Sequence, residues 1–174
     1  MKLFLLPLLA AVFCSPYAAQ ETCSLTLKDA PTLQNLRLGM PPEEVQTVFG
    51  RALKIKIKKK GWRVFFQNYI ENPAPPVLSG VRALYLRFFE GRLYQIEIFY
   101  ENRPEIKTIE DFENYLETTL KLPDLWRDER GRQTIRCVDF SLFADKILNP
   151  RVELTDETTR ARADEFLLEQ QNKK

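Results

Sequence analysis

The chain offers few side chains that could act as a catalytic base, because it contains no histidine. Histidine is the commonest general base and zinc ligand, and Ser-His and Cys-His catalytic arrangements depend on it. Two carboxylates, Glu97 and Asp139, could in principle act across a cleft as a glycosidase pair. Glu97 lies on the polar side of a strand pattern together with Arg87, which favours a cross-strand ion pair instead. The sequence therefore predicts a non-enzymatic protein without catalytic, metal-binding or cofactor-binding residues.

Residues 1–19 have the pattern of a signal peptide, with a positive start, an apolar run and a small-residue tail before the expected cleavage after Ala19. The apolar run is shorter than the roughly 20 residues of a membrane-spanning helix. Phe13 stands where a bacterial lipoprotein has a small residue before its acylated cysteine, so a lipid anchor on Cys14 is not expected. We therefore expect residues 20–174 to be exported to the periplasm or the extracellular space. The alternative is a hydrophobic first helix or strand of a cytosolic fold.

Cleavage of this leader would leave Cys23 and Cys137 as the only cysteines. In an oxidising compartment two cysteines most simply form one disulfide. A redox or nucleophilic thiol is the weaker interpretation, because the chain has no CxxC spacing and no histidine to activate a thiolate. The predicted bond joins the start of the mature chain to a strand near its far end.

Basic side chains are concentrated between residues 51 and 63, where seven of thirteen positions carry a positive charge. They are Arg51, Lys54, Lys56, Lys58, Lys59, Lys60 and Arg63. Alternation over 53–57, followed by three lysines and a glycine, predicts a β-hairpin with a cationic turn. Such a ridge could bind anionic lipid, polysaccharide or an acidic protein patch. The alternative is that the lysines protect a solvated edge strand from aggregation.

The hydrophobic pattern predicts an α+β domain with a mostly antiparallel sheet and two or three short helices. Strands are expected at 24–28, 53–57, 62–70, 81–89, 92–100, 134–144 and 151–155, and helices at 42–49, 108–120 and 156–171. We expect one domain over 20–174, although residues 20–100 and 101–174 could form two halves of a tandem helix-plus-sheet arrangement.

The clearest hairpin joins the strands at 81–89 and 92–100. A three-residue loop, Phe89-Glu90-Gly91, would pair Leu84 with Ile96 and Leu86 with Tyr94. The expected buried face holds Leu84, Leu86, Phe88, Tyr94, Ile96 and Ile98, and the opposite face holds Arg87, Gln95 and Glu97.

The run L-x-L-G-M-x-x-E-E-V-x-x-x-F-G over residues 36–50 combines a helix start at Pro42 with a glycine stop. Its matching positions are Leu36, Leu38, Gly39, Met40, Glu43, Glu44, Val45, Phe49 and Gly50. This run resembles the helix-entry motif of the SmpA/OmlA-type family, small envelope proteins of the outer-membrane assembly machinery with a β-lactamase-inhibitor-protein-like fold. The resemblance extends over about residues 36–70. It implies that Leu38, Gly39, Met40, Val45, Phe49 and Gly50 pack a short helix against the sheet, and that the sheet or its rim contacts partner proteins.

Together these features predict an exported, non-enzymatic protein-interaction or envelope-assembly module with an envelope or secreted protein as its partner. Two alternatives remain. The chain could be an inhibitor-like protein whose aromatic sheet surface, or Pro-rich loop at 73–76, plugs a target hydrolase. It could instead bind anionic envelope lipids through the Lys-rich hairpin. Nucleic acid is not expected as a partner of an exported chain.

Overall fold

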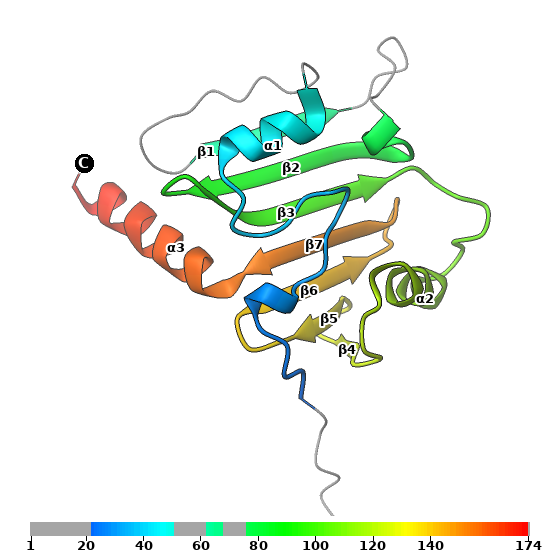
Figure 1. Cartoon of the computed structure of the whole chain (residues 1–174). Helices are drawn as coiled ribbons and strands as arrows, with labels where there is room; N and C mark the ends of the chain where they lie inside the picture. The colour runs from blue at the N-terminus through cyan, green and yellow to red at the C-terminus, as the bar shows by residue number, and fades with distance from the viewer. Residues whose placement is uncertain (1–21, 51–61, 68–75, 174) are drawn as a thin grey trace, which may run out of the picture.

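The computed structural model describes residues 22–50, 62–67 and 76–173. The predicted signal peptide and the basic residues Arg51, Lys54, Lys56, Lys58, Lys59 and Lys60 lie outside this part of the chain. The described residues form one antiparallel sheet of seven strands together with three α-helices, which confirms the predicted α+β fold (Figure 1). Across the sheet the strands are β1 (Trp62–Gln67), β2 (Val81–Phe89), β3 (Arg92–Tyr100), β7 (Arg151–Asp156), β6 (Phe140–Asp145), β5 (Gln133–Arg136) and β4 (Arg127–Asp128). The helices are α1 (Pro42–Phe49), α2 (Ile109–Leu120) and α3 (Glu157–Asn172).

The sheet is continuous between the first and second parts of the chain. β3 pairs with β7 through five residue pairs, from Gln95 opposite Thr155 to Phe99 opposite Arg151. The strands of 20–100 and of 101–174 therefore share one hydrogen-bonded sheet, and the two parts are not separate sheets.

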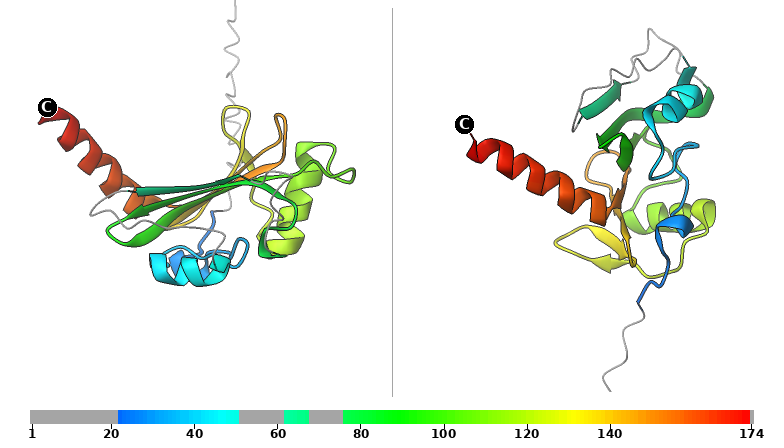
Figure 2. Two further views of the ribbon diagram at one scale, coloured as in Figure 1. Left: turned by 90° about the horizontal axis from the view of Figure 1, so that it is seen from above. Right: turned by 60° about the vertical axis from the view of Figure 1, so that its left-hand side comes forward.

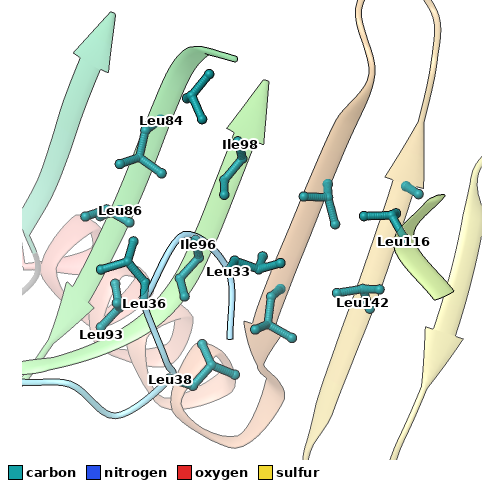
Figure 3. Close-up of a cluster of buried hydrophobic side chains, with 14 of the residues drawn as sticks. Leu33, Leu36, Leu38, Leu84, Leu86, Leu93, Ile96, Ile98, Leu116 and Leu142 are labelled. Carbon is teal, nitrogen blue, oxygen red and sulfur yellow. The ribbon is translucent and has the colours of Figure 1, made fainter. Parts of the chain in front are cut away.

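One face of the sheet is covered by α1, α2 and the N-terminal segment, whereas α3 leaves the end of β7 and projects away from the sheet (Figure 2). Between the sheet and the covering layer lies the apolar core (Figure 3). The N-terminal segment contributes Leu33, Leu36 and Leu38, α2 contributes Phe112 and Leu116, and the strands contribute their inward-facing residues. We call the other side of the sheet the polar face.

The segment that resembles the envelope family forms α1 and its attachment to β3. Pro42, Val45 and Phe49 are buried, and Gly50 follows the helix with φ of +58°. Gly39 N–H donates to the Leu93 carbonyl at 2.8 Å, and Leu93 N–H donates to the Met40 carbonyl at 2.9 Å. These bonds hold the entry to α1 against the sheet.

The register of the β2–β3 hairpin differs from the prediction. The loop has two residues, Glu90 and Gly91, both with positive φ (48° and 74°), which is typical of a type I′ turn. A shift between Arg87 and Phe88 then brings Leu84 opposite Ile98 and Leu86 opposite Ile96. The predicted partners were wrong, because a β-bulge in this hairpin keeps the apolar residues on one face of the sheet although the loop has only two residues.

Tyr94 lies on the opposite side from the one predicted, as a consequence of the same irregularity. It packs with Phe89 and Ala163, and Phe166 of α3 completes this small cluster. The Phe89 and Phe166 ring centroids are 5.8 Å apart. This cluster packs α3 against the β2–β3 hairpin around Ala163 and Phe166.

Two predicted strands take other forms. Residues 24–28 contain no strand, and a 3-10 turn at Leu27–Asp29 begins there, because the Asp29 carboxylate accepts from Thr26 N–H (3.1 Å) and Oγ1 (2.8 Å). Residues 134–144 form the hairpin of β5 and β6 instead of one strand. Its turn leaves Val138 64% exposed, although alternation placed this side chain on the apolar face.

Candidate interaction face

The polar face is built by alternate residues of six strands, and its side chains stand in cross-strand rows. The first row is Arg87, Gln95, Thr155, Ser141 and Arg136; the second is Tyr85, Glu97, Glu153, Phe143, Thr134 and Arg127; the third contains Phe99, Arg151 and Asp145. Because directly opposite residues share a side of the sheet, strand order alone brings these side chains together. The predicted polar positions Arg87, Gln95 and Glu97 lie on this face.

Five side chains form a continuous series of arginine and aromatic contacts across the polar face. We call Tyr85, Phe99, Arg151, Phe143 and Arg132 the arginine–aromatic ladder. Tyr85 and Phe99 meet edge to face at 5.8 Å, and the Arg151 guanidinium lies 5.6 Å from the Phe99 ring and 5.2 Å from the Phe143 ring. The Arg132 guanidinium also contacts the Phe143 ring, at 4.8 Å from its centroid. Such contacts between a guanidinium and an aromatic ring are favourable.

Arg151 is also the charge partner of two buried carboxylates. Its Nη1 lies 3.3 Å from Glu97 Oε1, and its Nε lies 3.3 Å from Asp145 Oδ2. The second contact is an ion pair without hydrogen-bond geometry, since Nε has no hydrogen-bond partner. The side chains of Glu97 and Asp145 are only 12% and 8% exposed. Arg151 therefore compensates two charges that would otherwise be costly to bury.

The sequence predicted Arg87 as the partner of Glu97, and this assignment was wrong. Arg87 lowers the pKa of Glu97 only as a minor contributor, behind Arg151. Burial is the largest influence and raises the pKa of Glu97 above its ordinary value of 4.5, and Glu153 directly opposite raises it further. Arg151 opposes this rise.

Glu97→Gln is expected to remove one pH-dependent component of stability. With its folded pKa raised above 4.5, Glu97 makes the wild type lose free energy of unfolding as the pH rises through that value toward the folded pKa. The glutamine variant lacks this loss, so the difference in free energy of unfolding, variant minus wild type, should increase as the pH rises. Urea unfolding at a series of pH values measures it. A pH-independent difference would show that Glu97 titrates normally.

Asp139 does not share a site with Glu97. It lies in the β5–β6 turn, where its carboxylate accepts from Leu27 N–H at 3.3 Å and its carbonyl accepts from Glu157 N–H at 3.0 Å. The structure thus assigns the two candidate glycosidase carboxylates to different environments, each with its own partner.

Beside Glu97, Gln95 is buried within the polar face. Its side-chain amide donates to Glu153 and to Thr155 Oγ1, the latter at 3.2 Å, which fixes the orientation of the amide. Among the described residues, Gln95 Oε1 and Thr134 Oγ1 on this face are buried without a hydrogen-bond partner. Buried polar atoms of this kind are uncommon and require an explanation.

Next to β4, the polar face deepens into a groove of about 910 Å³. Its walls are the β4–β5 turn and the first residues of α3, and its floor includes Thr134, Ser141 and Phe143. Phe143 and Arg132 belong to both the groove and the ladder.

The predicted cysteine pair is found at disulfide distance. The sulfurs of Cys23 and Cys137 are 1.94 Å apart, and the bond joins the N-terminal segment to the end of β5. A backbone hydrogen bond joins the same two segments, since Val138 N–H donates to the Leu25 carbonyl at 3.1 Å.

Of the basic residues proposed from the sequence, only Arg63 falls within the described residues. Its Cα lies opposite that of Arg87 at the β1 edge. The other six lie outside the described part of the chain, so the binding role of the Lys-rich segment stays a prediction.

The sequence did not indicate Arg132, Phe143 or Arg151 as candidate site residues. For Phe143 and Arg151 the only sequence signal was alternation within 140–145 and 151–156, which does not identify the neighbouring strand, and Arg132 lies in a charged turn outside both ranges.

Comparison with protein-family models, with curated proteins and with solved structures found no significant match. The resemblance to the SmpA/OmlA-type family accordingly stays a prediction. None of the helices in the described part of the chain is long and apolar enough to cross a membrane. Among residues 22–50, 62–67 and 76–173, no cluster of acidic or cysteine side chains is arranged to hold a metal ion.

Proposed function

We propose that this protein is an exported, non-enzymatic protein-interaction module that binds its partner through the polar face. The observation that carries the proposal is the arginine–aromatic ladder. Arginine and large aromatic residues are the side chains that most often dominate the binding energy of protein interfaces. Five such side chains, those of the ladder, lie together on the side of the sheet opposite α1 and α2.

The ladder is held in place before any partner binds. Arg151 is fixed by two carboxylates and two rings, and Tyr85, 36% exposed, rests against Phe99. Side chains that are already ordered lose little conformational freedom on association, which favours tight binding. The face thus has the rigidity expected of a binding surface.

Exposed apolar side chains lie in the β6–β7 turn, which ends at Arg151. Ile147 and Leu148 are 77% and 80% exposed, and the turn that carries them is closed by the pairing of Asp145 with Arg151. Two adjacent, highly exposed aliphatic residues beside the ladder favour a protein as the partner.

The carboxylates of the polar face support a non-enzymatic role. Glu97 and Asp145 are occupied by Arg151, and Glu153 accepts hydrogen bonds from Gln95 and Thr155.

Export is supported by the Cys23–Cys137 pair, because disulfides persist mainly in oxidising compartments.

Site-specific photo-crosslinking tests the proposal. A photoreactive phenylalanine analogue replaces Tyr85 on the polar face or, as the control, Asn114 on the exposed side of α2. With envelope extract of the producing cells, the Tyr85 variant should give one discrete protein adduct and the Asn114 variant none. Adducts from Asn114 alone, or from neither variant, would contradict the proposal. A hydrolase as the captured partner would identify the inhibitor-like form of the same function.

A further inference from the structure

Another cavity lies on the covered side of the sheet, between the N-terminal segment, the end of β3 and α2. Its volume is about 270 Å³. This is just below the range of about 300–1,000 Å³ that is typical of small-molecule sites, so the cavity has room for a ligand of about one ring. Leu33 and Leu116 line it and are each only 1% exposed, so they form its base within the core (Figure 3). The base therefore offers apolar contact to one side of a small ligand.

Around this base the cavity is lined by neutral side chains that form hydrogen bonds. They are the amides of Gln34 and Asn35, the phenol groups of Tyr100 and Tyr115, and the hydroxyls of Thr32 and Thr119. No charged side chain of the described residues belongs to the lining. Amides and hydroxyls both donate and accept hydrogen bonds, so this lining suits a ligand that can do the same.

The two amides are carried by a tight turn whose ends are anchored in the core. Leu33 N–H donates to the Leu36 carbonyl at 2.9 Å, and Leu36 N–H donates to the Leu33 carbonyl at 2.8 Å. Between these buried leucines, Gln34 and Asn35 have φ of +50° and +62°. Positive φ is uncommon in residues other than glycine and asparagine, and such strained positions are concentrated at functional sites. The turn thus holds both amides in fixed positions beside the cavity.

The two amides differ in whether the protein already uses them. Burial raises the pKa of Tyr100, and a hydrogen bond with Gln34 opposes this rise, so the Gln34 amide has a partner in the folded chain. The Asn35 side chain is exposed and forms no hydrogen bond with any of the described residues. The Asn35 amide is therefore positioned by the turn and remains available to a ligand.

These features restrict the chemistry of the ligand. A charged ligand would lose hydration in the cavity without gaining an opposite charge. A wholly apolar ligand would remove water from the amides and hydroxyls without replacing their hydrogen bonds. A sugar ring avoids both costs, because it is uncharged, has hydroxyl groups at its edge and presents C–H groups on its faces.

We propose that this cavity binds a single neutral sugar ring. The ring hydroxyls bond to the Asn35 amide and the Thr119 hydroxyl, and one C–H face lies toward the base formed by Leu33 and Leu116. The proposal is independent of the proposed function, because the cavity lies on the side of the sheet opposite the polar face.

Titration of ¹⁵N-labelled protein, followed by NMR, tests this proposal. The probes are four neutral sugars, glucose, galactose, mannose and N-acetylglucosamine, together with charged glucuronate. At least one neutral sugar should bind with a dissociation constant on the order of 1 mM or lower and shift the side-chain amide signal of Asn35. The absence of binding by all four neutral sugars overturns the proposal, as does tighter binding of glucuronate.

Asn35→Gly separates a ligand-binding role from a structural one. Glycine adopts positive φ readily, so the urea midpoint should change little, whereas sugar affinity should fall by about threefold or more. Adding Thr119→Val should bring the loss to about tenfold. The matched control Thr118→Val removes the hydroxyl of the preceding residue of α2, which is exposed and outside the cavity. Wild-type affinity in Asn35→Gly/Thr119→Val, or an equal loss in the control, overturns the proposal.

Discussion

Replacing Arg151 by leucine is expected to lower the free energy of unfolding by about 3 kcal/mol or more. The substitution leaves Glu97 and Asp145, both largely buried, without the cation that compensates them. It also removes the guanidinium from between the Phe99 and Phe143 rings. Urea unfolding at neutral pH measures the loss. Since Arg151 lowers the pKa of Glu97, the same variant should raise that pKa further.

Two further variants establish the cause of this loss. Arg151→Lys keeps the charge but lacks the planar fork, so its stability should lie between those of wild type and Arg151→Leu. Combining Arg151→Leu with Glu97→Gln and Asp145→Asn removes the uncompensated charges and should recover much of the stability. If Arg151→Leu unfolds at the wild-type midpoint, or the triple variant is no more stable than the single one, Arg151 does not have this role.

Removing the disulfide by Cys23→Ser/Cys137→Ser is expected to cost about 4 to 5 kcal/mol. The bond spans 114 residues of sequence, so its loss returns a large amount of conformational freedom to the unfolded chain. Urea unfolding of the variant and of wild type under oxidising conditions measures the difference.

Reductant provides the matched control for this prediction. Reduced wild type should unfold close to the double serine variant, which should itself not respond to reductant. Equal stability of oxidised and reduced wild type would show that the bond between Cys23 and Cys137 contributes nothing to stability.

The helices were predictable because their signals are local. Pro42 and Gly50 delimit α1, and α2 begins with a capping box in which Thr108 Oγ1 accepts from Asp111 N–H at 3.2 Å. Asp156 caps α3 as predicted, accepting from Thr159 N–H at 2.9 Å. Each of these contacts spans only a few residues of sequence.

The candidate site was less predictable, because it depends on strand order. The ladder requires β7 to lie between β3 and β6, which places Arg151 of a late strand beside Phe99 of an early one. Alternation identifies the side of a strand on which a residue lies, but not the neighbouring strand. For this reason the sequence assigned Glu97 to Arg87, its neighbour within the hairpin, when the charge partner is Arg151.

The β5–β6 hairpin shows a second limit of sequence reasoning. Its turn at Val138 and Asp139 contains no glycine or proline, and the apolar alternation continues through it. The turn is nevertheless closed by Cys137 N–H donating to the Phe140 carbonyl at 2.9 Å, beside the disulfide and the contact with Leu25. Tertiary contacts outweigh the local pattern at this point.

Hydroxyl-radical footprinting of aromatic side chains tests the binding role of the polar face most directly. The protein is labelled alone and in complex with the partner captured through Tyr85. We predict that Tyr85 and Phe143 become several-fold less reactive in the complex, whereas Tyr115 on α2, on the opposite side of the sheet, keeps its reactivity. Protection of Tyr115 with unchanged labelling of Tyr85 and Phe143 would contradict the assignment of the polar face as the binding surface.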